Sequence, residues 1–103
     1  MFRRRRFREV IERQLSFFLE DDSDLLDDVD RALEKYNRAD RDDAEELYGD
    51  YQLAIEAATD RLAELRDTYA RTLEDDDAEQ YVHEFNRRVV GRWGELALTI
   101  EES

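Results

Sequence analysis

Residues 44–72 read AEELYGDYQLAIEAATDRLAELRDTYART, and this stretch decides the fold. Its core-facing positions alternate at spacings of four and three through four heptads; they are Ala44, Tyr48, Tyr51, Ile55, Ala58, Leu62, Leu65, Tyr69 and Thr72. A 3.5-residue repeat is typical of helices that pack at a shallow crossing angle, as in coiled coils. Gly49 leaves the register unchanged, so the pattern predicts one coiled-coil-like helix over about residues 40–74.

The preceding segment predicts a long helix over about residues 2–36. Its apolar side chains recur three and four residues apart, at Phe7, Ile11, Leu15, Phe18, Leu25, Val29, Ala32 and Tyr36. The acidic run 20–24 puts Asp22 on the apolar side, which leaves open a break with Ser23 capping a further helix. Because the register agrees on both sides of this run, we expect one continuous helix. The register fails beyond residue 36, which predicts a hairpin turn at about 37–42 and Asp40 as the next N-cap.

A third helix is predicted over about residues 77–101. One face of it carries Ala78, Val82, Phe85, Val89, Trp93, Leu96 and Ile100. Asp77 and Gln80 form a capping-box pattern, which begins this helix and makes residues 73–76 the second turn. Acid-before-base pairs four residues apart, such as Glu84 and Arg88, indicate solvated helix surfaces.

Short connections force consecutive helices to run antiparallel. The expected fold class is therefore all-α: an elongated antiparallel three-helix bundle, made of a long coiled-coil-like helical hairpin and a third helix. With 103 residues, the chain is expected to form a single helical domain over 1–103, in which residues 1–8 are a basic end that frays. The tyrosines of the second helix and Trp93 are interpreted as core filling.

Composition removes several classes of enzyme. There are 16 Lys and Arg against 29 Asp and Glu, a net charge of −13, and there is no Cys, which excludes thiol catalysis, Cys-ligated zinc and iron–sulfur clusters. The glycine-rich phosphate-binding motifs and the HExxH and GxSxG signatures are also missing. His83 is the single His, and Gln80 stands three residues before it, where a di-iron bundle needs Glu. We expect a non-catalytic protein with no cofactor and no metal site.

The charge is unevenly distributed along the chain. Residues 1–19 hold six Arg and two Glu, whereas residues 20–103 hold ten bases and 27 acids. The basic patch, with Phe2 and Phe7 beside it, consists of Arg3, Arg4, Arg5, Arg6 and Arg8. Such a segment could bind anionic lipid or nucleic acid, or pair with an acidic stretch of its own or a neighbouring chain. Because the acidic body repels polyanions, we favour pairing with an acidic stretch of its own or a neighbouring chain, keep lipid open and disfavour nucleic acid.

Two strips of small or apolar residues lie off the predicted core faces. Val10 and Phe17 lie about 100–120° from the apolar stripe of the first helix. On the third helix the strip lies nearly opposite the core face and consists of Val90, Gly91, Gly94 and Leu98. Glycine on an outer helix face costs about 1 kcal/mol relative to Ala unless close packing offsets it. The strips predict a self-association surface; the other interpretation is that Gly91 and Gly94 mark a helix end, with residues 95–101 as a separate short turn.

These features predict a helical interaction or assembly module that forms a homo-oligomer, with a dimer favoured, and that could also bind another protein. The alternative is a peripheral protein that docks on anionic membranes through its Arg/Phe-rich N-terminal helix. No stretch approaches the roughly 18 apolar residues of a membrane span. Acids also follow the basic start at once, where a signal peptide needs an apolar region, so we expect a cytoplasmic protein.

Overall fold

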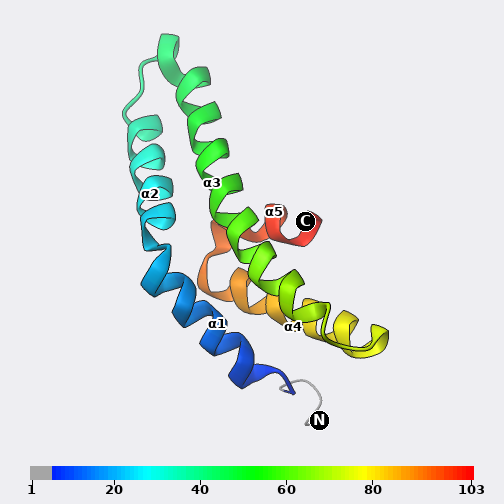
Figure 1. The fold of residues 1–103 in the computed structure, drawn as a ribbon. Helices are drawn as coiled ribbons and strands as arrows, with labels where there is room; N and C mark the ends of the chain where they lie inside the picture. The colour runs from blue at the N-terminus through cyan, green and yellow to red at the C-terminus, as the bar shows by residue number, and fades with distance from the viewer. Residues whose placement is uncertain (1–5) are drawn as a thin grey trace.

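The computed structural model describes residues 6–103, and all regular structure in this range is helical. The elements are α1 (Arg8–Asp21), α2 (Ser23–Asn37), α3 (Arg41–Ala70), α4 (Asp75–Arg92), the short 3-10 helix η2 (Gly94–Leu96) and α5 (Ala97–Glu102). The all-α class is therefore confirmed. Figure 1 shows α2 and α3 as an antiparallel hairpin, with α1 continuing from α2 and with α4 and α5 packed against the lower half of α3.

The helix predicted from residues 44–72 is confirmed as α3. It runs without interruption through Gly49, and the chain turns at residues 38–40, inside the predicted hairpin turn. Asp40 stands at the N-cap position in an extended conformation, without a side-chain cap hydrogen bond. Asp42 and Asp43 lie in the first turn, where the positive end of the helix dipole stabilises carboxylates.

The prediction of one continuous first helix is wrong, because the helix is interrupted at Asp22. This residue has φ −129° and ψ 19°, outside the helical region, and separates α1 from α2. Its carboxylate accepts a hydrogen bond from Arg61 Nε at 2.9 Å, and its backbone N–H closes α1 on the carbonyl of Phe18 at 2.8 Å. Because Asp is a poor helix former and has a cationic partner on α3, the acidic run bends toward α3. The helix also begins at Arg8 and not at residue 2; residues 2–5 lie outside the described range.

The third predicted helix also differs from the structure. It begins at Asp75, two residues before the predicted start, with Glu74 and not Asp77 in the cap position, and it ends at Arg92. Trp93, at φ −137° and ψ 80°, turns the chain into η2 and α5. The turn brings Leu96 and Ile100 back onto the core, where both are fully buried. The alternative interpretation, a helix end near Gly91 and Gly94, is the one that the structure bears out.

The molecule is elongated, 50 Å by 25 Å by 23 Å, and its core occupies only one part of the long axis. The buried apolar residues of that core are Phe7, Ile11, Leu15, Phe18, Val29, Ile55, Ala58, Leu62, Ala63, Tyr81, Phe85, Val89, Leu96 and Ile100. None of residues 30–54 is buried. We call residues 23–54, which comprise α2, the turn and the first half of α3, the arm; it projects beyond α4 and α5 at the top of Figure 1.

Candidate interaction surfaces

The described part of the basic patch is tied to its own chain. Arg6 donates from Nη1 and Nη2 to the two carboxylate oxygens of Asp77, at 2.6 and 3.3 Å, and its guanidinium lies 5.1 Å from the ring centroid of Phe7. Arg8 is exposed, and Arg3, Arg4 and Arg5 lie outside the described residues. Of the alternatives for this segment, pairing with an acid of the same protein is therefore the one that Arg6 adopts.

Phe7 faces the core and not the solvent. Its side chain is 6% exposed, and its ring packs edge-on against Tyr81 at a centroid distance of 5.5 Å. The Tyr81 hydroxyl in turn donates to Gln14 Oε1 at 2.7 Å, which ties α4 to α1. A lipid surface could reach Phe7 only if this packing came apart.

Glu84 lies near the backbone amide of Phe7, and its burial was not predicted from the sequence. Only 8% of the residue is exposed, and among the described residues neither carboxylate oxygen has a hydrogen bond of good geometry. Burial raises the pKa of Glu84 from its ordinary 4.5, while Arg88 and the backbone amide of Phe7 partly offset the shift. The expected solvated pair of Glu84 and Arg88 is not formed; Arg88 instead donates to Glu12 of α1 at 2.8 Å.

Arg66 is the second buried charge that the sequence did not reveal. It is 2% exposed, and its guanidinium donates to Asp67 Oδ1 at 2.8 Å and to Asn86 Oδ1 at 2.9 Å. It also donates to the Ser103 carbonyl and hydroxyl oxygens, both at 3.2 Å. This side chain fastens the segment after α5 to α3 and α4. The sequence does hold an indication of this burial, because Arg66 follows Leu62 by four residues and therefore lies on the same face of the helix.

The predicted self-association residues no longer share one helical face. Val90 and Gly91 lie in α4, Gly94 lies in η2 and Leu98 lies in α5. Val10 and Val90 are half-buried against the molecule's own core. Gly91 and Gly94 are exposed, and a Cβ at either position would meet nothing within 4 Å, so close packing does not explain them within one chain.

Phe17 and Leu98 are the large apolar side chains among the predicted residues that reach solvent. Phe17 is 52% exposed on α1, and Leu98 is 78% exposed on α5. Leu53, on α3, is similarly exposed at 65%, although no prediction singled it out. Large exposed apolar side chains on a strongly charged surface are the positions at which a partner would gain the most from burial.

The arm carries an aromatic cluster, which we call the tyrosine face and define as Tyr36, Tyr48 and Tyr51. The ring centroids of Tyr36 and Tyr48 are 5.3 Å apart, and those of Tyr48 and Tyr51 are 6.3 Å apart. Tyr48 is 46% exposed, and its hydroxyl accepts a hydrogen bond from Gln52 at 2.7 Å. The interpretation of Tyr48 as core filling is therefore wrong, because the arm is only two helices thick there. Tyr69 and Trp93, by contrast, pack against the core.

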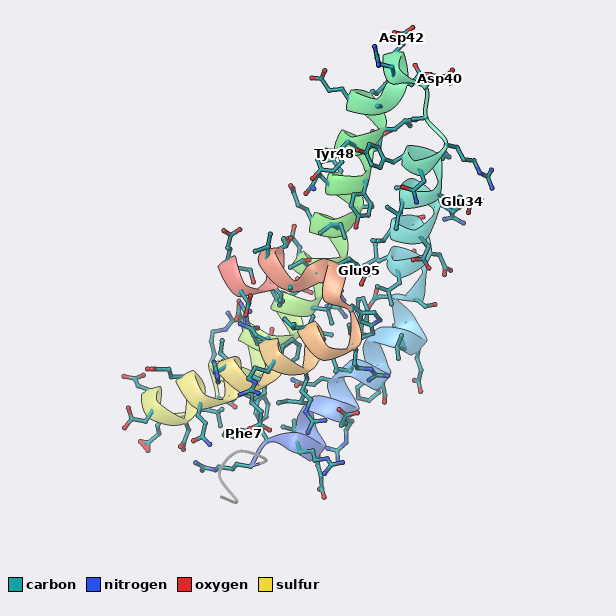
Figure 2. The ribbon with its side chains drawn as sticks, turned by 180° about the vertical axis from the view of Figure 1, so that it is seen from behind. Phe7, Glu34, Asp40, Asp42, Tyr48 and Glu95 are labelled. Atoms are coloured by element: carbon teal, nitrogen blue, oxygen red, sulfur yellow. The ribbon has the colours of Figure 1, made fainter. Side chains whose placement is uncertain are left out.

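Acidic charge surrounds this cluster. Burial, the Glu95 carboxylate and Tyr48 together raise the pKa of Tyr51, so Glu95 lies close enough to act on it. In Figure 2, η2 brings Glu95 to the arm below Tyr48, while Asp40 and Asp42 stand at the tip. Tyr48 is thus the exposed ring of the tyrosine face, with Tyr36 and Tyr51 half-buried beside it. It lies in an acidic setting, which suits guanidinium or ammonium groups.

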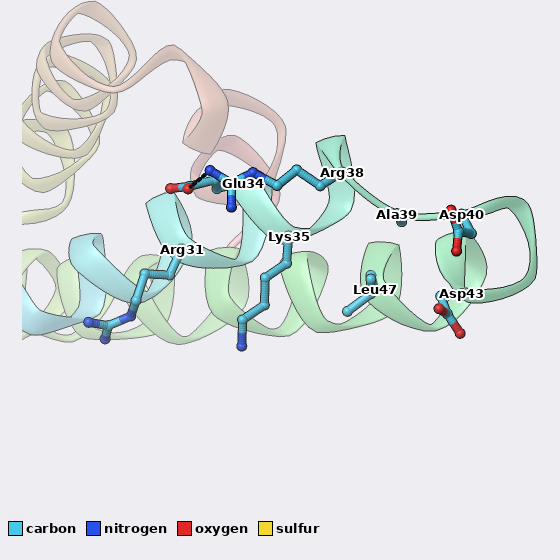
Figure 3. Close-up of a pocket in the computed structure, with 8 residues that line it drawn as sticks. All are labelled: Arg31, Glu34, Lys35, Arg38, Ala39, Asp40, Asp43 and Leu47. Atoms are coloured by element: carbon cyan, nitrogen blue, oxygen red, sulfur yellow. Dashed lines mark hydrogen bonds and ion pairs between the residues drawn. The ribbon is translucent and has the colours of Figure 1, made fainter.

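A groove of about 560 Å³ lies between α2 and α3 near the tip of the arm (Figure 3). It is lined by Arg31, Glu34, Lys35, Arg38, Ala39, Asp40, Asp43 and Leu47. Both signs of charge are present, and Arg38 already pairs with Glu34. The lining therefore offers no concentrated charge of one sign to a ligand.

Within residues 6–103 there is no group of three or more His, Cys, Asp or Glu side chains arranged to hold a metal ion. In the same range no helix combines the length and the apolar character that crossing a membrane requires.

Comparison with known proteins finds no matching family model, no matching curated protein and no matching solved structure.

Proposed function

We propose that this protein is a non-catalytic helical interaction module that assembles into a homodimer through Phe17 and Leu98. The observation that carries the proposal is the exposure of these two side chains, 52% and 78%, on a chain in which 44% of residues are charged. Burying a Phe or Leu side chain contributes about 1.5–3 kcal/mol, so two such residues in each of two copies supply a substantial driving force.

The positions of the neighbouring strip residues support the same surface. Val10 and Val90 are half-buried, so a second copy would complete their burial. The open space around Gly91 and Gly94 leaves room for the backbone or side chains of another molecule to approach. The six predicted residues come from α1, α4, η2 and α5, and Phe17 and Leu98 offer most of the exposed apolar area among them.

The test is the solution mass, measured by light scattering behind a sizing column in about 1 M NaCl, where long-range charge attraction is screened. We expect a dimer for the wild-type protein and a monomer for Phe17→Asp and for Leu98→Asp, with helical circular dichroism retained, since both residues are exposed. Leu53→Asp is the matched control because Leu53 is equally exposed but lies outside the strips; it should stay dimeric. A monomeric wild-type protein, or a dimer in both variants, would contradict the proposal.

Membrane docking remains the alternative and has less support. Of the aromatic residues that it used, Phe7 is buried, and of its arginines Arg6 is paired with Asp77. Phe17 stays available. Co-sedimentation with anionic vesicles at low salt distinguishes membrane docking from the interaction module. Binding that is lost when Arg3–Arg6 are changed to Ser would favour membrane docking. No binding would contradict membrane docking and favour the interaction module.

A further inference from the structure

We propose that the tyrosine face of the arm is a docking site for the Arg/Phe-rich segment, residues 2–5, of a second copy of this chain. Copies would then join head to tail, with the basic end of one on the acidic arm of the next. The inference goes beyond the dimer proposed above, because it uses neither Phe17 nor Leu98.

Part of the surface of the arm is not covered by another helix. Where α4, η2 and α5 cover α3, its residues Ala58 and Leu62 are fully buried, whereas none of residues 30–54 is buried. Figure 2 shows that these helices reach the arm only as far as Glu95, below Tyr48. Tyr48 therefore keeps 46% of its surface exposed next to Tyr36 and Tyr51.

The arm and residues 2–5 are opposite in charge. The arm holds eleven acids and four bases, and two of those bases, Arg31 and Arg38, already pair with Asp28 and Glu34. Residues 2–5, by contrast, are one Phe and three Arg. Guanidinium groups stack on aromatic rings, and this protein already stacks Arg92 on Trp93 at 5.3 Å. An Arg-rich segment is thus the chemistry that an acidic, tyrosine-rich surface recognises. The same excess of acids opposes direct pairing of two arms.

Residues 2–5 cannot reach the arm of their own molecule. Arg6 precedes α1, and the tyrosine face lies at the far end of α2, after 14 and 15 residues of helix. Each helix is roughly 20 Å long. Residues 2–5 extended from Arg6 span only about 14 Å. Since the two ends lie apart along a 50 Å axis, the contact requires another copy.

A competing binding site for residues 2–5 is the acidic first turn of α4 in the same chain. Asp77 already holds Arg6, and the neighbouring Asp75 and Asp76 are exposed. If residues 2–5 bind these acids instead, the arm remains empty and no head-to-tail contact forms. A heterologous contact does not close on itself and lets chains grow with concentration, whereas the dimer through Phe17 and Leu98 has a fixed size.

The first experiment measures mass against concentration by light scattering, in about 0.05 M and about 1 M NaCl, between which the Debye length shrinks to about 3 Å. We use the Phe17→Asp, Leu98→Asp protein, so that failure of the dimer and failure of this contact are read separately. Mass should grow with concentration at low salt only. Changing Arg3, Arg4 and Arg5 to Ser should weaken association by about tenfold or more. The control changes three exposed arginines elsewhere, Arg13, Arg71 and Arg87, to Ser and should leave association unchanged.

The second experiment mixes two variants. One carries the Arg3, Arg4 and Arg5 changes and keeps an intact arm; the other carries Tyr48→Ala and keeps an intact basic segment. Both are made in the Phe17→Asp, Leu98→Asp background. Neither should assemble alone, but the mixture should form a complex of one copy of each, because one functional contact remains. Should Tyr48→Ala lose helical circular dichroism, the exposed-acid variant Glu45→Gln, Glu46→Gln, Asp50→Asn takes its place. Mass independent of concentration, an unaffected arginine variant, or no complex on mixing would each overturn the proposal.

Discussion

At the scale of single residues, the two buried charges have different surroundings. Arg66 has hydrogen-bond acceptors on α3, on α4 and in the segment after α5, so its burial is compensated. Glu84 has a raised pKa and, among the described residues, no hydrogen bond of good geometry. A carboxylate held away from water without strong donors destabilises the fold whenever it is ionised.

Glu84→Gln should therefore stabilise the protein at pH 7, by about 1 kcal/mol in the free energy of unfolding. Below pH 4.5 the carboxyl is protonated in both the folded and unfolded states, so the gain should vanish there. As pH rises from 4.5 through the raised pKa of the folded state, the wild-type protein loses this stability and the variant does not. Denaturant unfolding across pH measures the difference.

The matched control is Glu79→Gln, an exposed carboxylate on the same helix, which should leave the free energy of unfolding at pH 7 nearly unchanged. A variant at Glu84 that is less stable than the wild type at pH 7 would mean that the ionised carboxylate is held by a cation, and would contradict the burial argument.

At the scale of elements, the helices end or bend where tertiary contacts override local pattern. α1 ends just before Asp22, whose carboxylate accepts a hydrogen bond from Arg61 of α3. α4 ends just before Trp93, whose ring centroid lies 5.7 Å from that of Phe18. Gly49 presents the opposite case, since α3 passes through it without a kink and a Cβ there would meet nothing within 4 Å.

Gly49→Ala should therefore stabilise α3 by about 1 kcal/mol, because Ala loses less backbone entropy on forming a helix. The expected rise in Tm is about 5 °C. Ala57→Gly, at an exposed position of the same helix, should lower Tm by a similar amount. Thermal unfolding followed by circular dichroism checks both; a fall in Tm for Gly49→Ala would show that the glycine meets a partner or a bend in solution.

At the scale of the whole molecule, stability is concentrated at one end. The core is formed by α1, α4, η2, α5, the second half of α3 and Val29 near the start of α2, whereas the rest of the arm is two helices thick and strongly acidic. Local opening is cheapest where few apolar contacts must be broken. Because the arm is only two helices thick, Tyr48 stays exposed. For the same reason, binding of a partner should reduce local opening more in the arm than in the core.

Backbone amides of residues 30–54 should exchange with solvent at least about tenfold faster than those of residues 58–66 and 81–89. Hydrogen exchange followed by mass spectrometry measures this. Under conditions of head-to-tail assembly the difference should shrink, because the docked segment covers the arm. Equal protection in arm and core of the isolated molecule would contradict the unequal distribution of stability.

The amino-acid sequence by itself determined the all-α class, the unbroken α3 with its turn at residues 38–40, and most of the core, because apolar spacing along a helix fixes which side chains share a face. Only the tertiary structure decided the breaks at Asp22 and Trp93, the burial of Glu84 and Arg66, and the exposure of Tyr48. Each of these depends on which other element lies opposite the residue. Helical periodicity tells which residues face inward, but not whether another helix is there to cover them.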